Sequence, residues 1–231
     1  MAARVISVKG MLSTSLLLFT SLLPAQAVSM DSLPSGALPD LIAYAEHGEI
    51  EYTDAYPADT AELEEKAAAG DAESLFTLGV MYFFGYNVPK DLDKSMQFYS
   101  EAADKDHAAA QYNLGMMYLS GEGVKSDPKK AAGYLQRAAE SGVVLSQINL
   151  GLLYLEGRGV KRDPRQAVVW LSKAAETGEP ESCFALGKLY VQGDNGVPKD
   201  IDKGIKYLIR AAEQGHDGAK LMLECLKDSL K

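Results

Sequence analysis

Apolar residues recur at helical spacing in two successive segments of this chain. The first stripe follows the spacing i, i+4, i+7, i+8 and consists of Ala110, Leu114, Met117 and Tyr118. The second stripe begins after a short polar stretch and consists of Ala131, Tyr134, Leu135 and Ala138. Each stripe gives an α-helix one apolar face, so the pattern predicts a pair of amphipathic helices, called A and B below.

Residues typical of helix ends separate the two segments. Gly121 and Gly123 follow the A segment and Gly142 follows the B segment, as expected where a helix ends in the left-handed conformation. Asp127 is suited to accept the unpaired N–H groups of the first turn of helix B. Pro128 suits the first helical position, where no N–H is missed. Helix B is therefore predicted to begin directly after Asp127.

The same pair of segments is written four times. A Leu-Gly pair recurs every 36 residues, at Leu78-Gly79, Leu114-Gly115, Leu150-Gly151 and Leu186-Gly187. A tyrosine follows four residues after each of these leucines, and an aspartate precedes each B segment. Repetition at this period is typical of stacked helical hairpins. A motif written four times predicts architecture, whereas a catalytic site is built once.

A glycine in the middle of each A helix needs a physical reason, because it costs about 1 kcal/mol relative to alanine. We expect the missing Cβ to let the facing helix approach closely. The Ala-Ala pairs of helix B, such as Ala138-Ala139, are expected to form the other half of that contact. Aromatic residues also recur at one position of helix B and are predicted to lie in the core: Phe98, Tyr134, Trp170 and Tyr207.

The repeated line A-x-x-x-L-G-x-x-Y-x-x-G-x-G-V-x-x-D-x-x-K-A, closing on A-A-E-x-G, resembles the Sel-one-like repeat (SLR), a relative of the tetratricopeptide repeat. The resemblance covers residues 61–226 and implies an all-α fold, an α-α right-handed superhelix of four helical hairpins plus capping helices. Members of the family typically act as adaptors that gather other proteins. On this basis the solenoid spans residues 61–231, with repeats at 71–106, 107–142, 143–178 and 179–215 and a C-terminal capping helix at 217–229.

The N-terminal residues have the pattern of a secretory signal peptide. Arg4 and Lys9 precede an apolar stretch at residues 11–23, and a small-x-small cleavage site ends at Ala27. The alternative, a membrane anchor, needs about 20 apolar residues and this stretch is shorter. We therefore expect residues 1–27 to be removed and the mature protein to be periplasmic or secreted. Residues 28–60 are rich in Asp, Glu and Pro and are predicted to form a largely unstructured acidic leader.

Charge is unevenly distributed along the chain. The formal net charge is −9, and residues 28–65 contain ten carboxylates with neither Lys nor Arg. This balance argues against nucleic acid as a partner, because phosphate binding needs a concentrated basic surface. Twelve basic residues fall in A–B loops or first turns of helix B: Lys90, Lys94, Lys125, Lys129, Lys130, Arg158, Lys161, Arg162, Arg165, Lys199, Lys203 and Lys206. This edge either is simply solvated or meets anionic lipid headgroups peripherally, an acidic partner, or the acidic leader.

The sequence provides no catalytic constellation. Ser126 and Lys129 match S-x-x-K of β-lactamase-like enzymes, but Asp127 is the expected cap and leaves Ser126 outside the helix, and no S-D-N or K-T-G accompanies them. His47, His107 and His216 show no metal-ligand spacing, and the latter two are predicted to be solvated loop residues. No catalytic residue, cofactor site or metal site is therefore assigned.

Two cysteines raise the possibility of a disulfide. Cys183 lies on a predicted A helix and Cys225 on the capping helix, five residues beyond the position equivalent to Cys183. Neighbouring helices pack about 10 Å apart, and five residues add about 7.5 Å along the helix axis. A disulfide requires Cα atoms within about 7 Å of each other, so two thiols are predicted.

A partner-binding surface is predicted on the concave side of the superhelix. With 100° per residue and Leu114 pointing inward, Asn113, Met116 and Ser120 point the opposite way. The same positions in all four repeats give the candidate residues Thr77, Val80, Phe84, Asn113, Met116, Ser120, Asn149, Leu152, Glu156 and Lys188. The apolar members suit docking, and the asparagines suit the backbone of an extended peptide. The alternative is that these residues fill gaps between repeats.

Together these features predict an extracytoplasmic adaptor that binds another protein or an extended peptide. Two other functions stay open. One is a periplasmic inhibitor of a membrane sensor, and the other is a β-lactamase-like or penicillin-binding SLR protein, a reading suggested by a cysteine-rich branch of the family.

Overall fold

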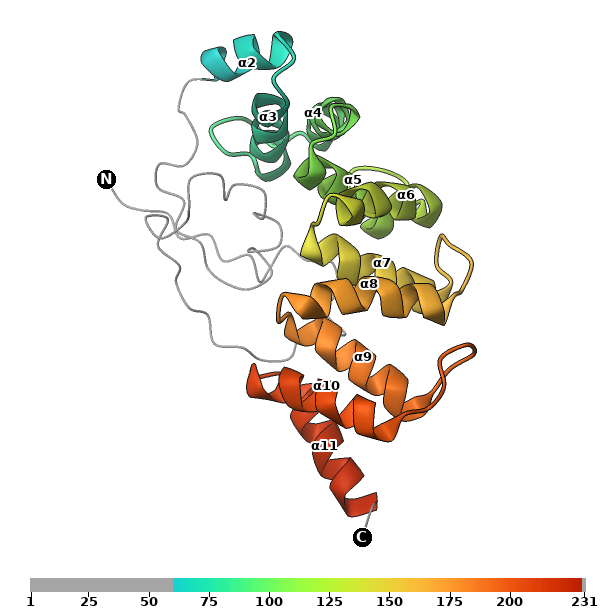
Figure 1. The fold of residues 1–231 in the computed structure, drawn as a ribbon. Helices are drawn as coiled ribbons and strands as arrows, with labels where there is room; N and C mark the ends of the chain where they lie inside the picture. Colours follow the sequence, from blue (N-terminus) through green and yellow to red (C-terminus); the bar gives the residue numbers. More distant parts are fainter. Residues whose placement is uncertain (1–59, 230–231) are drawn as a thin grey trace, which may run out of the picture. The chain divides into compact units, whose positions relative to one another are not determined.

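The computed structural model describes residues 60–229 of the chain, with side chains to residue 227 (Figure 1). The expected signal peptide and residues 28–59 of the acidic leader lie outside the described residues. Within the described part the secondary structure is helical, apart from one isolated bridge between Asp194 and Val197. The chain divides into two compact units, residues 1–105 and 106–231, and each is treated by itself.

The first unit contains three described helices. Helix α2 (Ala61–Ala68) packs against α3 (Ala72–Phe84), and α3 forms a hairpin with α4 (Leu92–Asp104). Asp71 begins α3 by accepting a 2.8 Å hydrogen bond from the backbone N–H of Ser74. Gly85, with φ of 81°, ends it. This hairpin is the first repeat.

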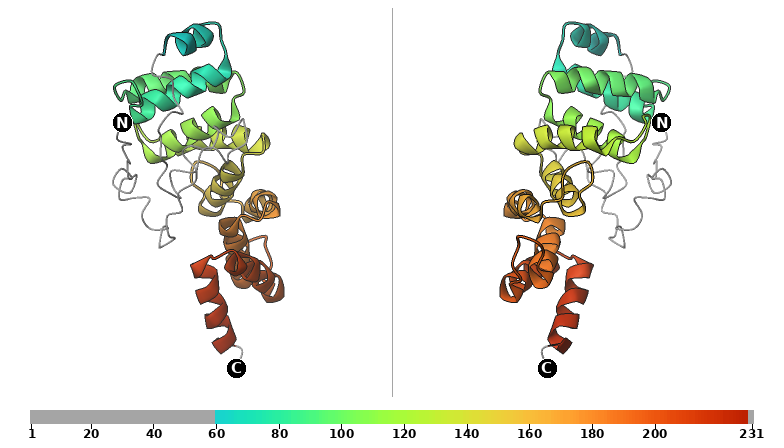
Figure 2. Two further views of the ribbon diagram at one scale, coloured as in Figure 1. Left: turned by 90° about the vertical axis from the view of Figure 1, so that its left-hand side faces the viewer. Right: turned by 90° about the vertical axis from the view of Figure 1, so that its right-hand side faces the viewer.

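The second unit contains three hairpins and a terminal helix. The A helices are α5 (Ala108–Ser120), α7 (Val144–Glu156) and α9 (Pro180–Gln192), and the B helices are α6 (Pro128–Glu140), α8 (Pro164–Glu176) and α10 (Ile201–Glu213). Helix α11 (Asp217–Ser229) follows. Each A helix packs against its own B helix, and each B helix also contacts the next helix in the chain. The helices of this unit thus follow one another in chain order (Figure 2).

The predicted helix starts are present. Asp127 accepts hydrogen bonds from the N–H groups of Lys129 and Lys130, both at 3.1 Å, and Pro128 is the first residue of α6. Corresponding caps are made by Asp91, Asp163 and Asp200. Because these side chains satisfy N–H groups that no helix residue can reach, the start of each B helix is fixed to one residue.

The mid-helix glycines let the two helices of each hairpin approach closely, as expected. A Cβ on Gly115 would lie 2.7 Å from Cγ of Leu135 and 3.4 Å from the carbonyl oxygen of Ala131. The expected partner was wrong, however. The gap left by the missing Cβ of Gly115, called a glycine notch below, receives Leu135 of helix B and not the Ala-Ala pair. Ala138 and Ala139 are buried, at 0% and 2% exposed, elsewhere on α6.

The recurring aromatic residues of helix B are not uniformly in the core. Trp170 is buried, whereas Phe98, Tyr134 and Tyr207 are half-buried. The last two stack on tyrosines of their own A helices, with ring centroids 5.8 Å apart for Tyr118 and Tyr134 and 6.0 Å apart for Tyr190 and Tyr207. A lysine ammonium lies over the A-helix ring in both hairpins. Each stack is therefore an edge of the core that a cation covers.

Helix α11 carries charged residues at positions that are packed against a B helix in α9. It aligns with α9 at a spacing of 37 residues, so Lys220, Glu224 and Lys227 occupy the positions of Cys183, Gly187 and Tyr190. Those positions of α9 face helix α10, since Gly187 meets Leu208 and Tyr190 stacks on Tyr207. The corresponding face of α11 therefore cannot bury a further B helix without burying charge.

Candidate protein-interaction surface

The A helices of the second unit present part of the predicted surface. Met116, Leu152 and Lys188 occupy equivalent positions on α5, α7 and α9, and Ser120 and Glu156 lie one turn further along the first two helices. Ser120, Glu156 and Lys188 are exposed, while Met116 and Leu152 are half-buried. These five residues are called the A-helix wall below.

The two predicted backbone-binding asparagines do not both reach the surface. Asn113 is 2% exposed, so the expectation that it faces a partner is wrong. The projection assumed that each A helix packs on one side, whereas α5 buries every residue from Ala109 to Gly115. Asn149 is half-buried, and its Nδ2 donates a 2.8 Å hydrogen bond to the carbonyl oxygen of Leu145 within its own helix.

The three candidates in the first unit lie mostly inside it. Val80 is 1% exposed and belongs to the core, which contradicts its predicted outward position. Phe84 is half-buried, packs edge-on against Phe83 at 4.9 Å and stacks on Tyr86 at 5.2 Å. Thr77 is also half-buried. The first unit therefore contributes an aromatic cluster in place of an open apolar row.

Leu152 supports the gap-filling alternative in part. It packs against the core cluster formed by the third and fourth repeats, which includes Ile148 and Leu186. Its side chain thus has a structural role and presents only its remaining surface. Met116 is half-buried like Leu152, and the exposed members of the wall, Ser120, Glu156 and Lys188, are polar.

His107 and His216 are helix caps, which corrects their prediction as solvated loop residues. Nδ1 of His107 accepts a 3.2 Å hydrogen bond from the N–H of Ala110, at the start of α5. Nδ1 of His216 likewise accepts from Ala219 at 3.1 Å. Its Nε2 lies 3.1 Å from a carboxylate oxygen of Glu181. Each of the two histidines directly precedes a helix, at the position where Asp71 caps α3 in the first repeat. That shared position was the sequence signal that could have indicated a cap.

The serine of the S-x-x-K match, Ser126, lies in the loop before α6. Its hydroxyl donates a 3.3 Å hydrogen bond to the carbonyl oxygen of Leu119, as expected for a loop residue. Within residues 60–227, no group of three or more His, Cys, Asp or Glu side chains lies close enough together to hold a metal ion. None of the described helices is long and apolar enough to cross a membrane.

Both cysteines are thiols in the structure, as predicted from helix spacing. Cys183 is buried on α9, and its burial raises the pKa of the thiol above the ordinary value. Cys225 is exposed on α11. Their different surroundings give them different reactivities, because the thiolate is the reacting form.

Successive A–B hairpins with glycine notches define a helical-repeat protein. A family profile described as the Sel1 repeat matches residues 72–107, 108–143, 144–178 and 180–216. The chain belongs to the Sel1 repeat family, whose members mediate protein–protein interactions and are generally scaffolds without catalytic activity.

Two solved structures support this assignment. One is c5321, a protective antigen present in uropathogenic Escherichia coli that displays an SLR fold. It is 37% identical with a TM-score of 0.66, over 70% of this chain and 34% of that one. The other is a Sel1 repeat protein from Oxalobacter formigenes, 32% identical with a TM-score of 0.66, over 70% of this chain and 66% of that one. The chain thus spans about a third of the first protein and just under two thirds of the second. Comparison with curated proteins found no match.

Proposed function

We propose that this protein is an extracytoplasmic adaptor that binds a partner protein along the A-helix wall of its second unit. The observation that carries the proposal is the repetition of outward side chains on a fixed scaffold. Three A helices place Met116, Leu152 and Lys188 at equivalent positions, and the glycine notches hold each of these helices against its B helix.

The chemistry of the wall favours a peptide with mixed apolar and polar side chains. The aliphatic surface of Met116 and Leu152 suits an apolar anchor residue. Lys188 and Glu156, on neighbouring helices, provide opposite charges that would fix the direction of the bound segment. Such a segment gains affinity from a few anchors and specificity from the flanking charges.

The position of Ser126 outside α6 argues against the β-lactamase-like alternative and so favours a binding role. Acylation needs the serine in the first turn of a helix with the lysine on the same face, and Ser126 stands before the cap of α6. We expect no nitrocefin turnover by the purified protein. Turnover that disappears in Ser126→Ala would instead establish the enzymatic function.

The extracytoplasmic location rests on the sequence of residues 1–27. We expect the mature protein to begin after Ala27, which N-terminal analysis of protein recovered from an envelope or culture-medium fraction would check. An intact Met1 in a cytoplasmic fraction would contradict the location and leave the interaction surface untouched.

Affinity capture with wall variants tests the binding function. Met116→Glu combined with Lys188→Glu should abolish capture of the specific partner, whereas Leu221→Glu, an exposed change on α11, should not. Far-UV circular dichroism should be the same for all three proteins. Equal capture by all three would refute the wall. An adaptor should recover several proteins, whereas a single receptor ectodomain would favour the alternative role of a sensor inhibitor.

A further inference from the structure

The outward face of the B helices in the second unit is strongly basic. Eight cations project from it: Lys129, Lys130, Arg137, Arg165, Lys173, Lys203, Lys206 and Arg210. The four carboxylates of these helices are distributed differently. Glu140, Glu176 and Glu213 are the last residues of α6, α8 and α10, and Asp202 is the only acid in an earlier turn. These eight cations are called the basic face.

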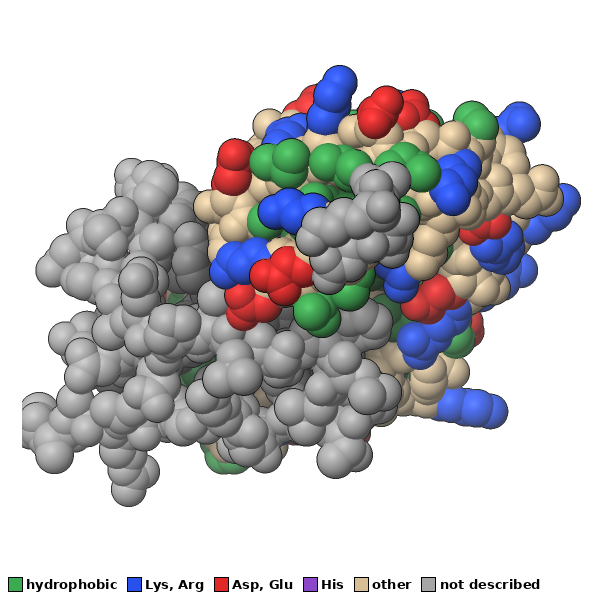
Figure 3. Space-filling view, turned by 90° about the horizontal axis from the view of Figure 1, so that it is seen from below, with side chains coloured by type: hydrophobic (Ala, Val, Ile, Leu, Met, Phe, Trp, Pro, Cys, Tyr) green, Lys and Arg blue, Asp and Glu red, His purple; other side chains and the backbone are tan. Residues whose placement is uncertain are grey.

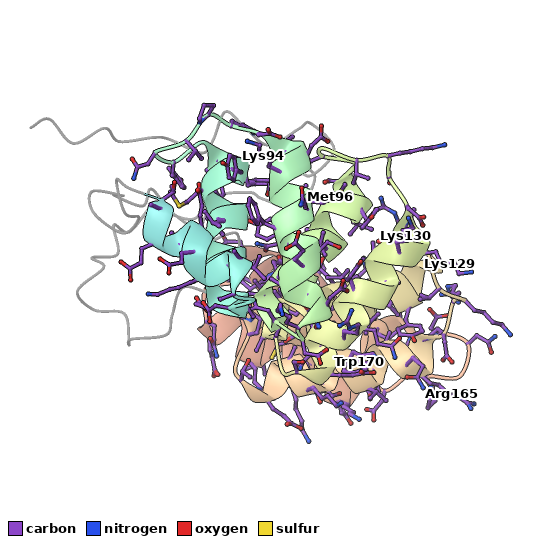
Figure 4. All side chains as sticks on the ribbon, turned by 90° about the horizontal axis from the view of Figure 1, so that it is seen from above. Lys94, Met96, Lys129, Lys130, Arg165 and Trp170 are labelled. Carbon is purple, nitrogen blue, oxygen red and sulfur yellow. The ribbon has the colours of Figure 1, made fainter. Side chains whose placement is uncertain are left out.

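Helical periodicity places these cations on one side. Taking Lys129 as the origin and stepping 100° per residue, Lys130 and Arg137 fall within about 100° of it. Their repeat equivalents fall at the same angles and are Arg165, Lys173, Lys203 and Arg210. Lys206 falls between them, at about 40°, and Asp202 of α10 occupies the position of Lys129. Seven of the eight side chains are exposed and Arg137 is half-buried. Lys129, Lys130 and Arg165 project outward from α6 and α8 on the same side of the molecule (Figure 4).

Most of this charge is held in place without being neutralised. Among the described residues, one ion pair involves this face and joins Arg137 to Asp106. The hydrogen bonds of Arg165, Lys203 and Arg210 go to uncharged oxygen atoms. Lys203 donates to the hydroxyl of Tyr190 and Arg210 to the carbonyl oxygen of Ala175, both at 2.8 Å. Cations held by neutral groups keep their full attraction for an incoming anion and lose less conformational freedom on binding.

Contacts between repeats keep the B helices side by side. Arg210 of α10 reaches the end of α8 through Ala175, and Arg165 at the start of α8 donates a 3.1 Å hydrogen bond to the carbonyl oxygen of Gly196 in the next loop. The loop before α8 touches the start of α6, because a Cβ on Gly159 would overlap the carbonyl of Pro128. The eight cations therefore belong to one surface.

Two open hollows on this surface are lined by its cations. One is lined by Lys203, Lys206, Tyr207 and Arg210, three cations and one aromatic residue. Another is lined by residues that include Arg165, Tyr190 and Lys203. Seen from the α11 end, lysine and arginine side chains project at the edge where the A–B loops lie, on the right of Figure 3. A carboxylate in either hollow would gain charge-assisted hydrogen bonds.

We propose that the basic face binds an acidic polypeptide segment of a partner protein, independently of the A-helix wall. A chain crossing three helices at about 10 Å intervals would meet cations on each of them. Membrane binding is less well supported, because Trp170 is buried at 8% exposed and Val169 and Ile209 are the exposed large apolar residues among the described parts of the B helices of this unit. The formal charge of −9 and the acids ending each helix disfavour nucleic acid.

Fluorescence anisotropy with labelled polyglutamate and the full mature chain tests this proposal. The variant Lys129→Glu with Lys206→Glu should bind at least about tenfold more weakly, because two attractions become repulsions. Neither side chain makes a hydrogen bond or ion pair among the described residues, and a glutamate near the start of α6 is compatible with the helix dipole. The control Lys220→Glu with Lys227→Glu changes the net charge equally, on α11 and outside both the basic face and the A-helix wall. It should stay within about twofold of wild type at 0.1 M salt, where the screening length is about 10 Å.

Three outcomes would overturn the proposal. The first is no binding of polyglutamate by the wild-type protein at low salt. The second is equal weakening in the two double variants, which would show a response to net charge alone. The third is binding to phosphatidylglycerol vesicles without binding to polyglutamate, which would assign the face to a membrane. Matching circular dichroism spectra of the three proteins exclude unfolding as the cause of any loss.

Discussion

Gly151 of α7 faces Leu171 of α8 so closely that a Cβ on the glycine would lie 2.7 Å from the leucine Cγ. The same position of α9, Gly187, meets Leu208 at the same distance. Leu171 and Leu208 are fully buried, so neither has room to move aside. These glycines set how closely the two helices of a hairpin approach.

Replacing Gly151 with alanine should therefore destabilise the protein, despite the better helix propensity of alanine. Overpacking costs about 1–3 kcal/mol and the propensity gain returns about 1 kcal/mol. We expect a net loss of up to about 2 kcal/mol in the free energy of unfolding, measured by urea denaturation.

Gly133 is the matched control for that substitution. It also lies inside a helix, but nothing stands within 4 Å of a Cβ built on it. Gly133→Ala should raise stability by up to about 1 kcal/mol. Equal effects of the two substitutions would show that the notch at Gly151 does not limit helix approach.

His107 should act as a replaceable cap of α5. His107→Ala removes the acceptor for the N–H of Ala110 and should cost about 0.5–2 kcal/mol of stability. His107→Asp restores a good acceptor at the same position and should recover most of that loss. Thermal denaturation of the two variants checks the role, which an equally unstable aspartate variant would rule out.

Asp194 should show a pH-dependent contribution through its ion pair with Arg162. The hydrogen bond from Arg162, followed by that from the N–H of Asn195, lowers the pKa of Asp194 below its ordinary value. A carboxyl with a lowered folded-state pKa stabilises the fold above its unfolded pKa, and this stabilisation is lost as the pH falls through the folded value. NMR titration should show the pKa of Asp194 rising in Arg162→Gln. An unchanged titration curve would mean that the pair does not form in solution.

The two cysteines should react at very different rates. In the native protein, Cys225 is exposed and should be alkylated by iodoacetamide readily, whereas Cys183 is buried with a raised pKa and should react slowly. Both should react after denaturation. Mass spectrometry of tryptic peptides gives the two rates, and a denatured protein without any reactive thiol would contradict the structure.

Much of the fold could be predicted from the sequence because its determinants are local. Asp127-Pro128 fixes the start of α6, and Leu114 and Met117, which the apolar stripe predicts to point inward, are both buried. The repetition of these signals made each hairpin an independent test of the same assignment. The close approach at Gly115 followed from the absence of its Cβ alone.

The interaction surface was less predictable, because it depends on what lies on every side of a helix. A helical projection gives the direction of Val80 and Asn113 but not whether neighbouring elements cover that direction, and both residues are buried. The role of His107 was missed for a different reason. Histidine is not among the usual capping residues, so its place before α5, equivalent to that of Asp71 before α3, was not recognised as a cap position.

The charged residues Lys220, Glu224 and Lys227 of α11 stand at positions that are uncharged in α5, α7 and α9, so the obstacle to packing a further B helix is confined to α11. Every hairpin before α11 has the same sequence pattern, so no residue within the repeats fixes the number of hairpins. A copy of residues 180–216 inserted ahead of α11 would pack between a B helix and α11, as the original residues 180–216 pack between α8 and α11. The array is thus modular, and its outward surfaces can lengthen by one unit at a time without redesign of the parts already present.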